Sequence, residues 1–358
     1  MNLDTKNVAA YLVERGVLSA DSDVLVKDVS RRNRNFRLLV GSTGFMVKQA
    51  LTASRSDALM LRREAYCYDF ARSDPILSRL MPALVMYDSS ANILVTRLAR
   101  NAESVADRNR RGVGIPPTLG EKLGEAVARY QALPVSAFER MEVRTPFPRR
   151  TPYILDAGEA AQKEWPHLGS LAPHFSALMR RRPDLSRLVD TFRTQWRQEC
   201  LLHGDVSWEN VLVSLTPMSQ PNLLIVDWEM ADIGDPAWDA GVVLRSFLSA
   251  WLLASQTCRN PREVPAGSGP PPIETMRALA LAFWTAYARA RGFDAETSRR
   301  ELERSMQFAA LQMAHVALEI GRSGQLKPEI GSSTLEVVDV AFTLFQNPQP
   351  PVRHLLGG

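Results

Sequence analysis

Short stretches in which apolar and polar residues alternate dominate the first hundred residues, and they predict a small antiparallel sheet. We expect its five strands over residues 24–29, 36–40, 45–49, 83–87 and 93–98. Residues 41–44 contain two glycines and are expected to form the turn between the second and third strands. Apolar positions at helical spacing predict one helix over residues 4–17 and another over 56–72.

Helical periodicity fills most of the remaining chain. Helices are expected over residues 118–133, 157–181, 183–197, 236–253, 273–291, 295–320 and 333–345. Pro166, Pro173 and Pro183 are expected to interrupt the second and third of these segments. Thr118 and Glu121 have the spacing of a capping box at a helix start, and Asp235 before Pro236 marks another start. Residues 346–358 are rich in proline, so we expect a disordered tail there.

Two short apolar runs interrupt the helical part and predict a β-hairpin. They are Val211–Val213 and Leu223–Val226, joined by a turn over residues 217–221. A hairpin brings the residue before its first strand and the residue after its second strand to the same end. Asn210 and Asp227 occupy these two positions.

The overall composition is that of a soluble globular protein. The chain has 358 residues, 45% hydrophobic and 23% charged, and is long enough to form two lobes. Its three cysteines (Cys67, Cys200 and Cys258) fit neither a disulfide framework nor a metal-ligand pattern, which favours a reducing, cytoplasmic setting. The first residues lack an apolar signal segment, and we find no apolar run long enough to span a membrane.

Positive charge is concentrated near the N-terminus. Residues 1–98 hold 14 Lys and Arg against 10 Asp and Glu, whereas residues 99–358 hold 29 of each. The basic residues gather between Lys27 and Arg37, where a solvated loop, a nucleic-acid contact and a phosphate-facing loop are the alternatives. Because no nucleic-acid-binding motif accompanies them, we favour the phosphate-facing loop and expect no nucleic-acid partner.

The segment from His203 to Asn210 carries the most informative chemistry. Asp205 and Asn210 are spaced D-x-x-x-x-N, the spacing of a kinase catalytic loop, and Asp227 follows the second hairpin strand. Asp205 is the candidate base that accepts a hydroxyl proton, while Asn210 and Asp227 offer the oxygen ligands that Mg²⁺ prefers. Asp and Asn at strand ends are also common turn formers, but their joint occurrence in this order favours phosphoryl transfer.

The two segments HGDVSWENVLV and IVDWEMADIGDPAWDAGVV resemble the aminoglycoside phosphotransferase and choline kinase-like family, a branch of the protein-kinase-like fold. The resemblance extends over about residues 24–345. It implies an α+β, two-lobed fold, with a small antiparallel-sheet N-lobe over 1–98 and a mostly helical C-lobe over 99–345. It also implies that Asp205 is the catalytic base, that Asn210 and Asp227 bind the metal, and that His203 braces the loop.

The resemblance also places a nucleotide in the N-terminal part. Lys48 takes the position of the lysine that holds the nucleotide phosphates, and we expect Glu64, on the helix over 56–72, to be its partner. The segment over 30–35 lacks the glycines of a kinase phosphate loop, so its side chains, Ser30 and Asn35 among them, are expected to face the phosphates. Leu98 is expected to lie in the hinge beside the purine. ATP is the expected co-substrate, with GTP not excluded.

Three functions remain open. The first is a kinase of a hydroxyl group on a small molecule. The second is a kinase of peptide Ser or Thr hydroxyls in natural-product maturation, with a partner lyase. The third is a catalytically silent kinase-like module. An aminoglycoside is a polycation that needs an acidic pocket, and the balanced charge of residues 99–358 argues against that acceptor.

Overall fold

The computed structural model describes most of the chain and divides it into two compact units. The described residues are 2–30, 33–50, 55–99, 101–139, 147–161, 165–214, 223–259, 273–322 and 328–356. The first unit comprises residues 1–107, 134–148 and 203–231, and the second comprises 108–133, 149–202 and 232–358. The lobes expected over 1–98 and 99–345 stay a prediction, because these units divide the chain at other points.

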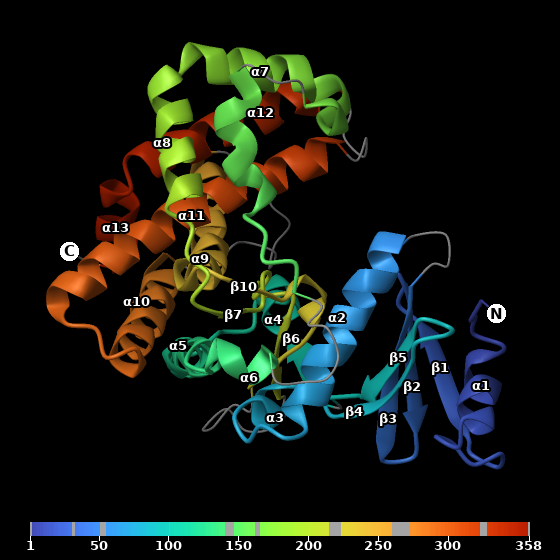
Figure 1. Cartoon of the computed structure of the whole chain (residues 1–358). Coiled ribbons are helices and arrows are strands. Elements are labelled where there is room, and N and C mark those ends of the chain that lie inside the picture. The colour runs from blue at the N-terminus through green and yellow to red at the C-terminus, as the bar shows by residue number, and fades with distance from the viewer. Residues whose placement is uncertain are drawn as a thin grey trace. The chain divides into compact units, whose positions relative to one another are not determined.

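A five-stranded antiparallel sheet forms the N-terminal part of the first unit (Figure 1). Its strands are β1 (Val24–Asp28), β2 (Arg34–Val40), β3 (Thr43–Gln49), β4 (Leu84–Asp88) and β5 (Ile93–Arg97), in the order β1-β2-β3-β5-β4. All five strands lie where the alternating pattern predicts them. The expected antiparallel sheet is therefore confirmed.

The two faces of this sheet have different partners, because successive side chains of a strand point to opposite sides. Phe36 and Val47 pair across β2 and β3 and lie in one apolar cluster with Tyr11 and Leu12 of α1 (Val8–Glu14). The next residue on β3, Lys48, therefore points to the other face. There it meets α2 (Arg55–Ala71), the helix that connects β3 to the fourth strand of the chain.

A second, three-stranded sheet completes the first unit. It has the order β6-β8-β9, with β6 (Ala102–Ser104), β8 (Val211–Ser214) and β9 (Leu223–Ile225). The β8–β9 hairpin is the one that the sequence predicts, although its expected turn over 217–221 lies outside the described residues. The remaining elements are α3 (Leu77–Leu80), α4 (Val105–Arg110, at the edge of the unit), α6 (Val135–Glu139) and the 3₁₀ turn η3 (Trp228–Met230).

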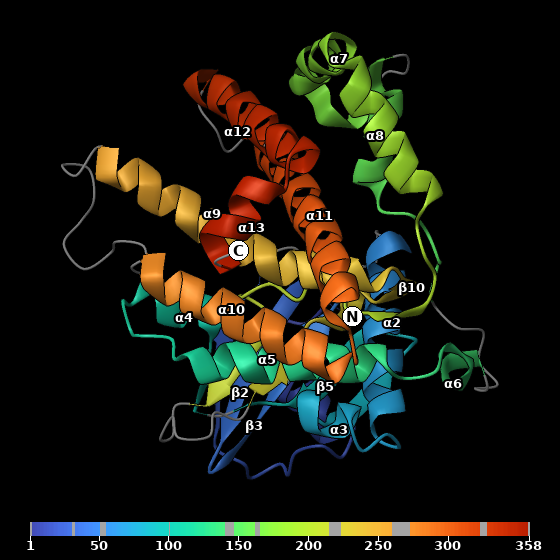
Figure 2. The ribbon, with the colours of Figure 1, turned by 90° about the vertical axis from the view of Figure 1, so that its left-hand side faces the viewer.

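The second unit is mostly helical, as predicted. Its helices are α5 (Pro117–Gln131), α7 (Ala172–Arg181), α8 (Pro183–Thr194), α9 (Pro236–Arg259), α10 (Ile273–Ala290), α11 (Ala295–Arg322), α12 (Pro328–Gln346) and α13 (Gln349–Leu356). Two 3₁₀ segments, η1 (Tyr153–Ala161) and η2 (Pro166–Leu171), and a two-stranded ladder of β7 (Cys200–Leu202) and β10 (Asp232–Gly234) accompany them. Figure 2 shows α5 and α10 side by side.

A buried ion network anchors the start of α9. Asp235 is fully buried, and its carboxylate accepts hydrogen bonds from the guanidinium groups of Arg197 and Arg304 and from the backbone N–H of Ala237. The last bond confirms the N-cap role expected for Asp235. These two guanidinium groups and the backbone N–H offset the free-energy cost of burying the negative charge of Asp235.

Three expectations about the helical part need correction. The segment over 157–181 breaks at Pro166, as expected, but it forms two 3₁₀ segments and α7, and Pro173 lies in the first turn of α7 without interrupting it. Thr118 lies inside α5, which begins at Pro117 and has no side-chain cap. The tail expected to be disordered contains α13, whose first residue, Gln349, donates a hydrogen bond to Glu303 Oε1 at 2.6 Å; prolines are tolerated in a first helical turn.

Cys67 and Cys200 are free and buried. Within the part of the chain that the structure describes, no helix is both long and apolar enough to cross a membrane. The cytoplasmic setting expected from the cysteines stays a prediction.

We predict that Gly124→Ala destabilises the second unit. A Cβ at this position of α5 would lie 2.3 Å from the carbonyl oxygen of Phe283 on α10, so the two helices would have to separate. The free energy of unfolding should fall by about 1–3 kcal/mol. Gly114→Ala is the control, because a Cβ there meets nothing within 4 Å. Equal unfolding midpoints in denaturant for the two variants would contradict this packing.

Candidate active site

Lys48 is the residue at which the sheet, helix α2 and the β8–β9 hairpin of the first unit meet. Its Nζ donates hydrogen bonds to Glu64 Oε1 and Oε2 at 2.7 and 2.9 Å, and to Asp227 Oδ1 at 2.5 Å. The Glu64 side chain is buried, whereas 38% of the Asp227 side chain is exposed. The Lys48–Glu64 pair expected from the sequence is present, and Asp227 is a second carboxylate partner.

Burial and neighbouring charges shift the proton affinities of this pair in the same direction. Burial raises the pKa of Glu64 to about 7; the Lys48 ammonium opposes the rise, and the carboxylates of Asp227 and Glu229 add to it. Burial by itself would lower the pKa of Lys48, but the Glu64 and Asp227 carboxylates outweigh it and raise that pKa above its ordinary value. Lys48 therefore stays charged, and Glu64 is the partner that titrates near neutrality.

His203 fixes the loop that follows β7. Its Nε2 lies 2.9 Å from the carbonyl oxygen of Val226, and its Nδ1 lies 3.2 Å from the backbone nitrogen of Asp205. Since the Asp205 N–H is a donor, Nδ1 accepts and Nε2 carries the proton that Val226 accepts. The imidazole is fully buried, and its ring packs edge-on against Trp228 at 4.6 Å. These contacts agree with the bracing role implied for His203.

Asp205 and Asn210 are held together inside this loop. The Asn210 Nδ2 donates to the backbone oxygen of Asp205 at 2.9 Å and to its Oδ2 at 3.1 Å. Gly204 precedes Asp205 with φ 83°, and a Cβ there would lie 2.4 Å from the Met230 carbonyl oxygen. Only glycine fits this conformation and this space, so the backbone directs the Asp205 carboxylate to one place.

The hairpin register brings Asn210 and Asp227 to one end, as the sequence predicts. Val211 pairs with Ile225, and the Val226 N–H donates to the Asn210 carbonyl oxygen at 2.9 Å. Asp227 is the next residue and adopts a left-handed conformation with φ 70°, which Asp tolerates better than most residues. Its backbone N–H donates to the Tyr68 hydroxyl of α2 at 3.4 Å.

Glu229 is a site residue that our sequence reasoning did not find. One carboxylate oxygen each from Glu64, Asp227 and Glu229 lie within 4.8 Å of one another. The Arg63 Nη1 donates to the Glu229 backbone oxygen at 3.0 Å, and the Asn33 Nδ2 donates to Glu229 Oε2 at 3.4 Å. The sequence did contain a sign of it, because Glu229 is an acidic residue only two positions after Asp227, in the 3₁₀ turn η3.

The donors at this end of the hairpin fit a magnesium ion. Carboxylate oxygens from Asp227 and Glu229 and an amide side chain from Asn210 are the hard oxygen ligands that Mg²⁺ takes in proteins. The two metal ligands predicted from the sequence, Asn210 and Asp227, therefore carry oxygen atoms of the kind that Mg²⁺ binds. The carboxylate of Glu229 is a further candidate ligand.

The other predicted nucleotide residues lie on the loop and strand edges of the same unit. The Ser30 hydroxyl accepts a hydrogen bond from the Asn35 N–H at 2.9 Å, so these two residues close the base of the β1–β2 loop. Arg31 and Arg32, which belong to the expected basic cluster, lie outside the described residues. Leu98 follows β5, and its N–H donates to the Gly44 carbonyl oxygen at 3.0 Å.

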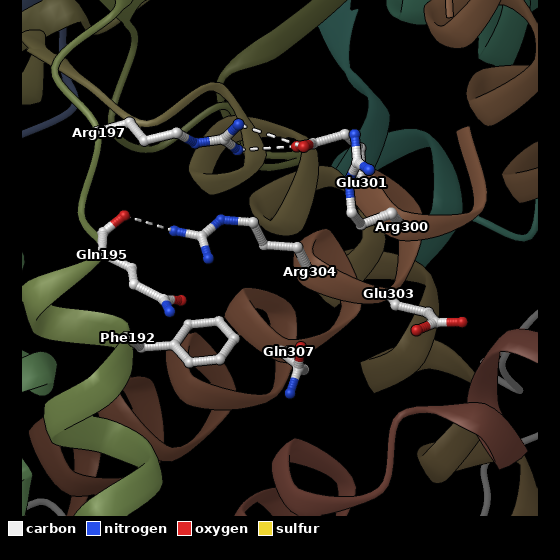
Figure 3. Close-up of a pocket in the computed structure, with 8 residues that line it drawn as sticks. All are labelled: Phe192, Gln195, Arg197, Arg300, Glu301, Glu303, Arg304 and Gln307. Atoms are coloured by element: carbon white, nitrogen blue, oxygen red, sulfur yellow. Dashed lines mark hydrogen bonds and ion pairs between the residues drawn. The ribbon is translucent and has the colours of Figure 1, made fainter. Parts of the chain in front are cut away.

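The second unit contains a cavity of about 430 Å³ beside its buried ion network (Figure 3). Figure 3 shows Arg197 reaching Glu301 and Arg304 reaching the Gln195 carbonyl oxygen across this cavity. The Arg304 guanidinium also lies over the rings of Phe192 and Phe308, 5.0 and 5.1 Å from their centroids. None of the predicted site residues lines the cavity, and two of its arginines, Arg197 and Arg304, anchor the start of α9 through Asp235.

The model of the phosphotransferase enzyme family matches residues 28–293. The GDP and kanamycin complex of APH(2″)-IIIa has a similar structure, with a TM-score of 0.58 at 17% identity over 94% of this chain and 99% of that chain. A choline/ethanolamine kinase family protein from Mesorhizobium loti has a TM-score of 0.54 at 15% identity, covering 98% and 97%.

LicA in complex with AMP has a TM-score of 0.53 at 14% identity, covering 95% of this chain and 98% of that chain. No curated protein matches the sequence at a significant level. At these identities the solved structures show the fold alone. They confirm the kinase-like α+β fold that the sequence resemblance implies.

We predict a pH-dependent difference in stability between the wild type and Glu64→Gln. The folded-state pKa of Glu64 lies at about 7, above its ordinary value of 4.5, so the folded protein holds more protons than the unfolded chain between these values. The unfolding free energy of the wild type, relative to that of Glu64→Gln, should therefore fall as pH rises from about 4.5 to 7. Denaturant titrations at several pH values measure it, and a constant or rising difference would disprove the shift.

Proposed function

Because this chain belongs to the phosphotransferase enzyme family, we propose that it transfers the terminal phosphoryl group of a nucleoside triphosphate to a hydroxyl group of a small molecule. The observation that carries the proposal is the meeting of Lys48, Asp227 and the Asp205–Asn210 loop within one compact unit. These groups supply what phosphoryl transfer requires, namely a base, oxygen ligands for a metal and a cation.

Asp205 is the proposed base. Its carboxylate accepts the proton of the acceptor hydroxyl as the oxygen attacks phosphorus. The amide of Asn210 holds Oδ2, and the imidazole of His203 holds the backbone of the same residue. This support keeps the carboxylate in one orientation, and positioning is most of what an enzyme contributes to this reaction.

Asp227 and Asn210 are the proposed magnesium ligands. Bound Mg²⁺ would neutralise charge on the transferred phosphoryl group and its leaving oxygens. Glu64 keeps Lys48 in place, since both of its oxygens accept from the ammonium. Lys48 then offers a fixed positive charge to the nucleotide phosphates next to Asp227.

The nucleotide site is proposed to extend from Lys48 toward Ser30, Asn35 and Leu98. ATP is the proposed co-substrate, with GTP not excluded. APH(2″)-IIIa was solved with GDP and LicA with AMP, so proteins of this fold accept either purine. The N–H of Leu98 is bonded to Gly44, so any contact of Leu98 with the purine would come from its other groups.

The acceptor is proposed to be a small hydroxylated molecule other than an aminoglycoside. The kanamycin bound by APH(2″)-IIIa is a polycation, whereas residues 99–358 of this chain carry equal numbers of acidic and basic side chains. The peptide acceptor with a partner lyase and the catalytically silent module, both considered from the sequence, gain no supporting observation from the described residues.

Asp205→Asn should reduce turnover by about 10²- to 10⁴-fold, the usual contribution of a general base. The Kd for the nucleotide should stay close to that of the wild type, because the carboxylate acts on the acceptor. Phosphate transfer from radiolabelled ATP and nucleotide titration calorimetry measure the two quantities. Asp69→Asn, an exposed acid on α2, is the matched control. Undiminished biological function in Asp205→Asn would favour a catalytically silent module instead.

In a screen of hydroxylated metabolites with ATP, we expect a neutral or anionic compound to be phosphorylated over many turnovers and kanamycin to remain unmodified. Mass spectrometry of the products detects the added phosphate. Multiple-turnover phosphorylation of kanamycin with tight binding would overturn the charge argument.

A further inference from the structure

Tyr68 is a buried residue of α2 that faces the candidate active site. Its side chain is 3% exposed, and it follows Glu64 by four residues, so the two lie on the same face of the helix. A buried tyrosine hydroxyl is unfavourable unless it forms hydrogen bonds, and phenylalanine would fill nearly the same space without that cost. The partners of the hydroxyl therefore indicate what it contributes.

Both partners of this hydroxyl belong to the site. Its oxygen accepts a hydrogen bond from the backbone N–H of Asp227 at 3.4 Å, and its O–H donates to the Glu64 carboxylate. Burial, and after it the negative charges of Glu64 and Asp227, raises the pKa of Tyr68 well above its ordinary value, so the hydroxyl keeps its proton. One hydroxyl group thus connects α2 to the residue that follows the β8–β9 hairpin.

The backbone of Asp227 requires such support. It adopts the left-handed conformation with φ 70° and ψ 54°, which is unfavourable for a residue other than glycine. The Val226 N–H still donates to the Asn210 carbonyl oxygen at 2.9 Å, but Asp227 lies one residue beyond that contact. Its side chain is 38% exposed, against 1% for Glu64, so surrounding atoms constrain it less. The bond to Tyr68 holds this backbone from the side of α2.

We propose that the Tyr68 hydroxyl is a positioning group for the carboxylate of Asp227. This inference rests on the proposed function, in which Asp227 binds Mg²⁺, and it adds a residue that acts only through Asp227. The hydroxyl fixes the backbone of Asp227 in its left-handed turn, while Lys48 holds Oδ1 of the same residue. A carboxylate held at both ends can meet a divalent cation without first being ordered, which is how supporting residues raise the affinity of metal ligands.

Helix α2 offers a matched control for the removal of this hydroxyl. Tyr68→Phe removes the hydroxyl and keeps the ring. Tyr66 lies on the same helix, is 8% exposed, and its hydroxyl donates to the carbonyl oxygen of Phe138 at 2.8 Å. Tyr66→Phe therefore also costs α2 one buried hydrogen bond, but it leaves the contact to Asp227 intact. A difference between the two variants reports on Asp227 and not on the packing of the helix.

The test measures the Kd for ADP of the full-length protein by titration calorimetry, once with Mg²⁺ and once with EDTA. In the wild type and Tyr66→Phe, Mg²⁺ should tighten ADP binding by the same factor. In Tyr68→Phe this factor should be about tenfold smaller, the effect expected for residues that support metal ligands, while the Kd in EDTA should stay unchanged.

Two further measurements show whether Tyr68 acts through Asp227. In an Asp227→Asn background, which has already lost the charged ligand, adding Tyr68→Phe should not reduce the effect of Mg²⁺ any further. Hydrogen exchange of residues 223–231 should be faster in Tyr68→Phe than in the wild type, because the Asp227 amide loses its acceptor. Tyr66→Phe should leave that exchange rate unchanged.

The outcomes separate this inference from the proposed function. If Tyr68→Phe gains as much from Mg²⁺ as the wild type does, the hydroxyl does not position Asp227 and the inference is wrong, although the proposed phosphotransferase keeps its metal ligands. If Tyr68→Phe weakens ADP binding equally in Mg²⁺ and in EDTA, the hydroxyl supports the site as a whole, and the inference is again overturned. If Mg²⁺ does not tighten ADP binding even in the wild type, the proposed metal site and this inference fail together.

Discussion

The buried ion pair between Lys48 and Glu64 is the interaction on which the site depends. A buried carboxylate or ammonium alone would be strongly unfavourable, so each requires the other. Because Lys48 lies on a central strand and Glu64 on α2, the pair fixes the helix against the sheet. The third member, Asp227, then ties the β8–β9 hairpin to the same ammonium. One cation thus joins three segments that are far apart in sequence.

The hairpin converts a sequence pattern into chemical geometry. Antiparallel pairing places Asn210 opposite Val226, and the left-handed conformation of Asp227 turns its side chain from the strand toward Lys48. His203 connects the catalytic loop to the hairpin. One of its ring nitrogens accepts a hydrogen bond from the backbone of Asp205, and the other donates to the carbonyl oxygen of Val226. One local structure therefore positions both the proposed base and the proposed metal ligands.

Strand alternation predicted the sheet and the hairpin. The family resemblance singled out Lys48, and the position of one helix then singled out Glu64 as its partner. Glu229 and Asn33 could not be predicted in the same way. They are separated by 196 residues and meet only through the tertiary fold. The three-residue strands β6, β7 and β10 are too short to show alternation. The C-terminal helix α13 was missed because its prolines suggest disorder, although both fit the first helical turn.

The most direct test of the central claim is a double-mutant cycle of Lys48→Met and Glu64→Gln, measured as the free energy of unfolding at pH 8. Each single variant removes one charge from the pair, and breaking a buried pair costs about 3–5 kcal/mol. The account predicts that the double variant loses clearly less stability than the sum of the two single losses, because it leaves neither member of the pair charged. Additive losses would show that Lys48 and Glu64 do not depend on each other, and would contradict the account.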